Sequence, residues 1–341
     1  MTDVRRRPAA DDTMANGPIR PSTSDGTAEQ SRSHATTAAA GTRRRVGAFA
    51  TAAPFTAVVA AVEVAIATAA LGVPLSTAPV AVGLVAFSVY AADHVADAEG
   101  DVGSTPARAQ FALRYGDQLM VAAALSYGLA VALAVGAGPA ALALVLVPGA
   151  VWVGYATDWL PTVGGLVAPL GDRVPRLGGV SVPRLKDVFL LNSAAVALAW
   201  AVAVVAAPLA FARVPVEPAH APTAALLFAY VAARSFVDVE VPNVRDVAAD
   251  AAQGVSTLPV VYGVAETRRI LFAVDGVAAG LLVALVATDA ASGSVVAALA
   301  AGLGVSVAVT ALADRLDGST LGVAPDCSYL VAGAVLLALG P

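Results

Sequence analysis

Two short stretches of the chain concentrate its carboxylates. The first, DHVADAEGD, places Asp93 and Asp97 four residues apart. The second, NVRDVAADAAQG, repeats that spacing with Asp246 and Asp250 and adds Asn243 one turn earlier. Side chains four residues apart on a helix project from one face, where like charges repel each other unless a cation lies between them. Ligand sets made only of oxygen suit a hard ion, so the spacing indicates a Mg²⁺ site.

Each stretch alone also has a simpler interpretation, because acidic pairs of this spacing occur in solvated loops that bind nothing. The two pairs, however, lie at equal offsets in the two halves of the chain, since Asp246 follows Asp93 at the same distance as Asp250 follows Asp97. This repetition favours an internal duplication in which the two pairs face each other across a central cavity.

Membrane-spanning helices are the elements that would position these residues. Of the 341 residues, 58% are hydrophobic and only 13% are charged, about half the charged fraction of a soluble domain. The mean hydropathy is +0.77, and the apolar residues form blocks of about 20, the length that crosses a bilayer as a helix. We therefore predict an all-α, polytopic membrane bundle of about nine helices. The predicted spans lie near residues 47–71, 75–92, 118–136, 138–157, 188–210, 221–239, 268–288, 294–312 and 321–340.

The basic residues orient these spans. Cytoplasmic loops of membrane proteins carry an excess of Lys and Arg. With the N-terminus in the cytoplasm, all of the 20 lysines and arginines except Arg213 fall on the cytoplasmic side. Both acidic stretches then begin cytoplasmic loops, and the central cavity opens to that face. We expect an integral cell-membrane protein with a cytoplasmic N-terminus.

Residues 1–45 differ from the rest of the chain. They are rich in Arg, Ser, Thr, Asp and Gly and nearly free of large apolar residues, so they cannot bury enough surface to offset the loss of chain entropy. We predict a disordered, Arg-rich tail at 1–45 and a membrane domain at 46–341. Beyond the short arginine clusters of the tail, the sequence gives no sign of a nucleic-acid partner.

One further carboxylate, Glu63, lies near the middle of the first predicted span. An ionised carboxylate is costly at that depth, so we expect it to face a cavity or a partner. A role at the acceptor end of the site and a protonated, locally hydrogen-bonded side chain are both open.

The two acidic stretches resemble those of the UbiA superfamily of intramembrane prenyltransferases. That family carries two Asp-rich motifs on cytoplasmic loops, after the second and sixth helices of a nine-helix bundle. The second stretch is the stronger match, because GVSTLPVVYG follows Asp250 in the expected place. Two departures concern the acidic ligands: Asn243 replaces a usual Asp, and Val89 and Tyr90 stand where the family usually has Asn-Asp. The resemblance covers residues 46–341.

The resemblance implies the function as well. It implies Mg²⁺-dependent transfer of a prenyl group from a prenyl diphosphate to a lipid-soluble acceptor in the membrane, such as a quinone precursor, an ether-lipid precursor or a carotenoid. The implied carriers of Mg²⁺ and diphosphate are Asp93, Asp97, Asp246 and Asp250, with Asn243 as a further metal ligand. The segment RLKDVFLLNSAAVALAWA also resembles the family's stretch that enters the fifth helix. The candidates to hold the diphosphate are Arg108, Lys186, Arg234, Arg245 and Asn192.

Two alternatives remain open at this level. The weakened first motif is compatible with a UbiA-like protein that has lost catalysis and only binds its ligands. A secondary transporter is the other alternative, although transporters usually place their charged sites near the middle of the bilayer. Here the acidic residues are expected mostly at one rim, with Glu63 as the main exception.

Overall fold

The computed structural model describes residues 53–103, 105–156, 191–213 and 221–340. The predicted tail at 1–45 and Lys186 lie outside these ranges, as does the side chain of Asn192. Every element in the described part is helical. In chain order the elements are α2 (Ala53–Ala70), α3 (Ala78–Ala96), the 3₁₀ turn η1 (Gly100–Val102), α4 (Pro106–Ala137), α5 (Pro139–Ala156), α7 (Leu191–Ala212), α8 (Ala221–Glu240), α9 (Asn243–Gln253), α10 (Leu258–Tyr262), α11 (Val264–Ala287), α12 (Gly293–Leu312), α13 (Gly318–Leu321) and α14 (Ala324–Leu339).

Seven of the described helices are long and apolar enough to cross a membrane, namely α2, α3, α4, α7, α8, α11 and α12. The apolar part of α5 and the whole of α14 are shorter. The structure therefore confirms the predicted all-α polytopic bundle. Where the sequence predicted nine spans, the described ranges hold seven of full length and two shorter apolar helices.

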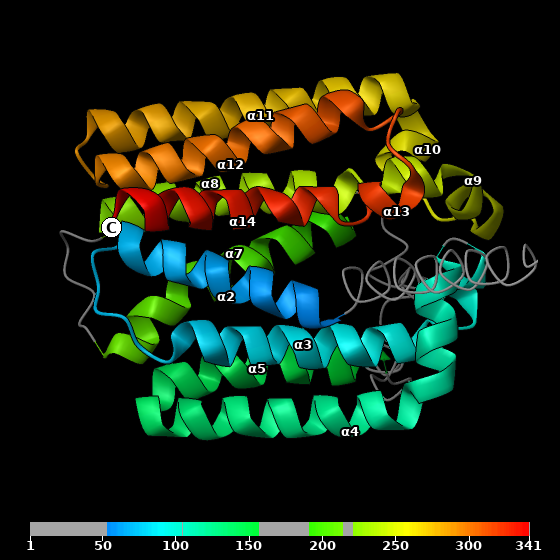
Figure 1. Cartoon of the computed structure of the whole chain (residues 1–341), viewed down its shortest axis with the longest axis horizontal. Coiled ribbons are helices and arrows are strands. Elements are labelled where there is room, and N and C mark those ends of the chain that lie inside the picture. The colour runs from blue at the N-terminus through cyan, green and yellow to red at the C-terminus, as the bar shows by residue number, and fades with distance from the viewer. Residues whose placement is uncertain (1–52, 104, 157–190, 214–220, 341) are drawn as a thin grey trace, which may run out of the picture. The chain divides into compact units, whose positions relative to one another are not determined.

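Small residues let neighbouring helices of the bundle pack closely. Helix α2 packs along α3, and α12 packs along α14 (Figure 1). A β-carbon at Gly83 in α3 would lie 2.8 Å from the carbonyl oxygen of Ala57 in α2, and one at Gly302 in α12 would lie 2.9 Å from the carbonyl oxygen of Ser328 in α14. Because interiors are close-packed, these two contacts leave no room for a side chain.

Helix α4 corrects the expected loop after the second span. It begins at Pro106 and runs for 32 residues, so Arg108 and Arg114 lie on a helix and not in a loop. The part of α4 after Tyr115, residues 116–137, is about 33 Å long at 1.5 Å per residue, close to the ~30 Å of bilayer hydrocarbon. Tyr115 has non-helical backbone angles (φ −121°, ψ 23°) and marks a kink between the two parts of α4.

The two acidic stretches were expected to begin loops, but the second is a helix and the first is helical up to Ala96. Asp93 lies in the last turn of α3, and Asp97 caps its C-terminus. The second stretch forms its own helix, α9, which begins at Asn243 and ends before Gly254. Gly254 has φ 72°, a left-handed conformation that glycine adopts without strain.

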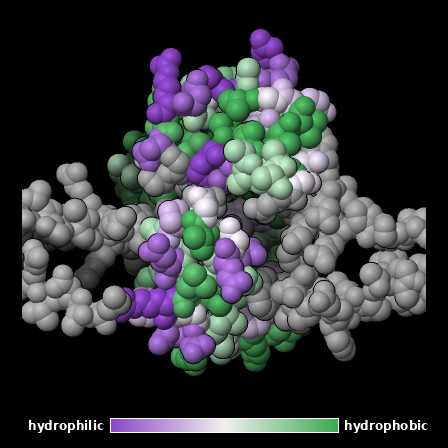
Figure 2. Space-filling view, turned by 90° about the vertical axis from the view of Figure 1, so that its right-hand side faces the viewer, coloured by the Kyte–Doolittle hydropathy of each residue, from purple (hydrophilic) through white to green (hydrophobic). Residues whose placement is uncertain are grey.

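The C-terminal end of α3, the N-terminal end of α4 and helices α9, α10 and α13 all lie at one end of the bundle, the right-hand end in Figure 1. Figure 2 views that end, on which hydrophilic side chains gather among hydrophobic ones. Both acidic stretches therefore belong to the same end of the bundle.

Candidate functional site

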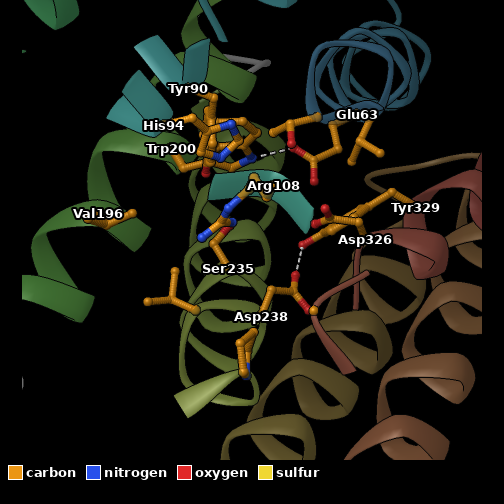
Figure 3. Close-up of a pocket in the computed structure, with 15 residues that line it drawn as sticks. Glu63, Tyr90, His94, Arg108, Val196, Trp200, Ser235, Asp238, Asp326 and Tyr329 are labelled. Carbon is orange, nitrogen blue, oxygen red and sulfur yellow. Dashed lines mark hydrogen bonds between the residues drawn. The ribbon is translucent and has the colours of Figure 1, made fainter. Parts of the chain in front are cut away.

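A cavity of about 200 Å³ lies inside the bundle, lined by side chains from α2, α3, α4, α7, α8 and α14 (Figure 3). Its lining contains several aromatic rings and three carboxylates, those of Glu63, Asp238 and Asp326. His94 and Arg108 supply basic groups. A polar chamber of this composition inside an apolar bundle is a candidate binding site, because ionisable residues within membrane helices usually face a ligand or a partner.

Glu63 meets its sequence-based expectation, since it faces both a cavity and a partner. It is 4% exposed, and its Oε2 accepts a hydrogen bond from Nε1 of Trp200 in α7 (Figure 3). Tyr90 of α3 packs edge-on against the same indole, with ring centroids 6.4 Å apart. Two aromatic side chains thus hold the region around the carboxylate in place.

Arg234 lies at the base of this region and is 1% exposed. Its Nη2 donates to Oδ1 of Asp238 at 3.2 Å and to Oγ of Ser328 at 2.9 Å. Its Nη1 donates to Oγ of Ser306 and lies 3.5 Å from Oδ1 of Asp275. These contacts join α8, α11, α12 and α14, so the position of Arg234 favours a role in helix packing over the diphosphate contact considered from the sequence.

Asp238, Asp326 and Tyr329 were not singled out from the sequence as site residues. The Tyr329 hydroxyl donates to Oδ2 of Asp238, and all three side chains line the cavity. A usable signal was present for both carboxylates, because each falls within an apolar predicted span. For Tyr329 we see no comparable signal in the sequence. These residues also mean that acid is not confined to the rim of the bundle.

The first acidic stretch reaches the cavity through His94, one of the three residues between its two aspartates. Asp93 and Asp97 are exposed at the end of α3, whereas His94 lines the cavity, as does Arg108 from α4. His94 also lies edge-on to Tyr90, with ring centroids 6.2 Å apart. Of the predicted diphosphate candidates whose side chains the structure describes, Arg108 is the one that lines the cavity.

The second acidic stretch is internally paired. Arg245 donates from Nε to Oδ1 of Asp246 at 2.7 Å, and its Nη2 lies 2.5 Å from Oδ2. This two-point contact is a geometry that guanidinium groups form with carboxylates and phosphates alike. Asn243 donates from Nδ2 to Oε2 of Glu240 at 3.0 Å. Pro242, directly before Asn243, lines the cavity, so this stretch too begins at the cavity rim.

Asp250 has a different environment from Asp246. Its Oδ2 accepts a hydrogen bond from Oγ1 of Thr257 at 3.2 Å. Burial raises the pKa of Asp250 above its ordinary value, while the hydrogen bond from Thr257 opposes that rise and the neighbouring Asp246 adds to it. The carboxylate therefore takes up a proton at a higher pH than an exposed aspartate does.

The donor set at this end of the bundle suits a hard divalent cation. All of its ligand atoms are carboxylate or amide oxygens, which Mg²⁺ prefers. Within the described ranges, no three His, Cys, Asp or Glu side chains come close enough together to hold a metal ion by themselves. Mg²⁺ commonly completes its coordination with substrate phosphate oxygens and water, so two separate carboxylate groups remain compatible with it.

The fold and the cavity define a polytopic helical membrane protein with a polar chamber beneath an acidic rim. The sequence model of the UbiA prenyltransferase family matches residues 177–320. The fold is similar to that of a UbiA homologue from Aeropyrum pernix K1 in its apo form, with a TM-score of 0.61 and 16% identity, over 83% of this chain and 97% of that chain. No curated protein matches the sequence. The family model thus matches part of the chain, and the fold is similar to that of a UbiA homologue.

Proposed function

We propose that this protein transfers a prenyl group from a prenyl diphosphate to a lipid-soluble acceptor, and that the reaction takes place at the cavity. The observation that carries the proposal is the meeting of both acidic stretches at one chamber: His94 lies between Asp93 and Asp97, Pro242 directly precedes Asn243, and both line the cavity. The prenyltransferase domain proposed spans residues 46–341.

The acidic rim would receive the diphosphate. We assign Mg²⁺ to Asp93, Asp97, Asn243, Asp246 and Asp250, because an anionic diphosphate does not approach clustered carboxylates without divalent cations. When bound, Mg²⁺ stabilises negative charge on the departing diphosphate.

Basic side chains would hold the diphosphate from the other side. Arg108 already lines the cavity, and Arg245 lies beside Asp246 with a guanidinium that also matches phosphate oxygens. Lys186 and Asn192 stay in the proposal on the resemblance alone.

The lining of the cavity suits C1 of the prenyl group, the carbon that reacts. The bond between C1 of the prenyl group and the diphosphate oxygen breaks, and its electron pair leaves with the diphosphate. The allylic carbon is then electron-poor until the acceptor captures it. Tyr90, Trp200 and Tyr329 present aromatic groups to the chamber, and such groups attract positive charge. The apolar isoprenoid chain lies among the surrounding helices.

We also propose that the acidic rim faces the cytoplasm and that the N-terminus lies on the same side. The distribution of Lys and Arg supports this orientation, since only Arg213 falls on the opposite side. The donor would then enter from the cytoplasm, while a lipid acceptor enters from the bilayer.

A non-catalytic member of the family is the second candidate. The pairing of Arg245 with Asp246 favours it, because the cation already neutralises one of the carboxylates that Mg²⁺ would need. Such a protein would bind diphosphate in the presence of Mg²⁺ and release no pyrophosphate.

The deciding experiment uses the purified protein in lipid nanodiscs with labelled geranylgeranyl diphosphate and an extract of membrane lipids. We expect pyrophosphate release that requires Mg²⁺ and that falls at least about 100-fold in Asp93→Asn and in Asp246→Asn, the loss usual for a group that supports transition-state charge. Asp289→Asn is the matched control, because Asp289 is exposed in the turn between α11 and α12. Mg²⁺-dependent binding of the donor without release of pyrophosphate identifies the non-catalytic protein. If the protein neither binds the donor nor releases pyrophosphate, both candidates are refuted.

A further inference from the structure

The inner wall of the cavity is acidic. Glu63, Asp238 and Asp326 come from three different helices and face the same space (Figure 3). Arg234, the cation behind this wall, is held by Asp238 and by Asp275. A ligand group that carries a negative charge would therefore meet repulsion at the inner wall.

One polar group in this wall lacks a partner. Ser235 of α8 lines the cavity and is 5% exposed. Among the described residues, nothing forms a hydrogen bond with its Oγ. A buried hydroxyl without a partner costs free energy, and a ligand that hydrogen-bonds to it recovers that cost.

The carboxylate of Glu63 is positioned so that it can contact a ligand in the cavity. Trp200 donates to Oε2, which orients the carboxylate from one side. The side chain itself lines the cavity, so it is within the space that a bound group would occupy. Trp200 lines the cavity too, and we regard it as a positioning residue for Glu63.

We propose that the acceptor is an uncharged lipid whose reacting group is a hydroxyl, bound by Ser235 and deprotonated by Glu63. This inference rests on the proposed prenyl transfer and names its acceptor class. The acceptor oxygen forms a bond to C1 of the prenyl group, the C1–diphosphate bond breaks with its electron pair on the diphosphate, and the hydroxyl proton passes to the Glu63 carboxylate. The product is an ether, and no oxidant or reductant is needed.

The size of the chamber agrees with this class of acceptor. At about 200 Å³ it is smaller than the 300–1,000 Å³ of pockets that enclose a whole ligand. A hydroxylated headgroup fits, whereas the lipid chain must lie between helices. An acceptor carrying a phosphate or carboxylate beside its hydroxyl would bring that charge against Glu63 and Asp326.

The test compares two acceptors that differ in one charged group, a long-chain 1-O-alkylglycerol and its phosphate ester. With labelled geranylgeranyl diphosphate and Mg²⁺ in nanodiscs, we expect kcat/KM for ether formation to be about 100-fold higher for the neutral lipid, as a like-charge contact of a few kcal/mol produces. Equal use of the two lipids, or preference for the phosphate, overturns the proposal while leaving prenyl transfer established.

Glu63→Gln tests the proton transfer separately from the position of the side chain, because the amide oxygen of Gln can still accept the hydrogen bond from Trp200. We expect kcat for ether formation to fall about 100-fold, as for the loss of a general base, with the Mg²⁺-dependent binding of the donor unchanged. Glu266→Gln, an exposed residue of α11, is the matched control. An unchanged kcat in Glu63→Gln refutes its role.

Ser235→Ala separates acceptor binding from chemistry. We expect a KM for the neutral lipid about tenfold higher at an unchanged kcat, the loss of one hydrogen bond. A second measurement needs no turnover: the neutral lipid should raise the melting temperature of the wild type more than that of Ser235→Ala. If it raises both equally, or neither, the acceptor is not bound at Ser235. If the wild type releases no pyrophosphate with any acceptor, the proposed function itself fails.

Discussion

The hydroxyl of Tyr329 in α14 donates a hydrogen bond to Oδ2 of Asp238 in α8, while Oδ1 of the same carboxylate accepts from Arg234. One carboxylate, only 11% exposed, is thus hydrogen-bonded on both oxygens by residues of two helices that are far apart in sequence. The arrangement fixes one wall of the cavity, because Asp238 and Tyr329 both line it.

Removing the Tyr329 hydroxyl should weaken the fold without disrupting it. In Tyr329→Phe, Oδ2 of Asp238 loses its donor inside the bundle, which costs about 1–3 kcal/mol. Thermal unfolding in detergent should show a lower melting temperature than for the control Tyr115→Phe, whose ring is partly exposed on α4. Equal melting temperatures would show that water replaces the hydroxyl at no cost.

Arg234 should matter more to stability than any other arginine in the described ranges. Arg234→Met removes the cation shared by Asp238 and Asp275 and leaves buried carboxylates uncompensated, a loss of about 3–5 kcal/mol. Arg269→Met is the control, because Arg269 is 77% exposed and pairs only at the surface with Glu266. If Arg234→Met keeps its melting temperature but loses donor binding, the guanidinium serves the diphosphate and not the packing.

The close contact between α12 and α14 predicts opposite effects of one substitution at two nearby glycines. Gly302→Ala places a β-carbon 2.9 Å from the carbonyl oxygen of Ser328, so the helices must separate at a cost of about 1–3 kcal/mol. Gly304→Ala, two residues further along α12, meets nothing within 4 Å and should stabilise by up to about 1 kcal/mol through helix propensity. Melting temperatures of the two variants check this directly, and a lower value for Gly304→Ala would contradict it.

The hydrogen bond from Thr257 should tune the pH dependence of the acidic rim. Burial raises the pKa of Asp250, and Thr257 opposes that rise, so Thr257→Val should raise the pKa further. Only the ionised carboxylate binds Mg²⁺ well. The acidic limb of Mg²⁺-dependent pyrophosphate release should therefore move to higher pH in Thr257→Val. Thr288→Val, at the opposite end of α11, is the control. A shift toward lower pH would rule out this account.

The sequence predicted the helical membrane architecture well because hydrophobic length is a local property. The eighth predicted span, 294–312, differs from α12 by a single residue at its start. The loops were predicted less well, since α4 begins at Pro106 and α9 forms a separate helix. Polar residues outside an apolar block do not reveal whether they continue a helix.

The interior polar contacts could not be predicted, because they join residues that are distant in sequence. Trp200 reaches Glu63 across 137 positions, and Arg234 reaches Ser328 across 94. Asp326 was visible as an interruption of the last predicted span, yet only the folded bundle shows that it faces the same space as Glu63. A single sequence predicts the depth of a carboxylate in the membrane better than it predicts which side chains surround that carboxylate.

The kink in α4 has a geometric consequence for the cavity. Arg108 reaches the cavity from the part of α4 that precedes the kink at Tyr115. An α-helix turns by about 100° per residue, so one residue inserted between Arg108 and Tyr115 would rotate the guanidinium by more than a quarter of a turn away from the chamber. The number of residues between the kink and Arg108 therefore sets the direction in which this guanidinium group points.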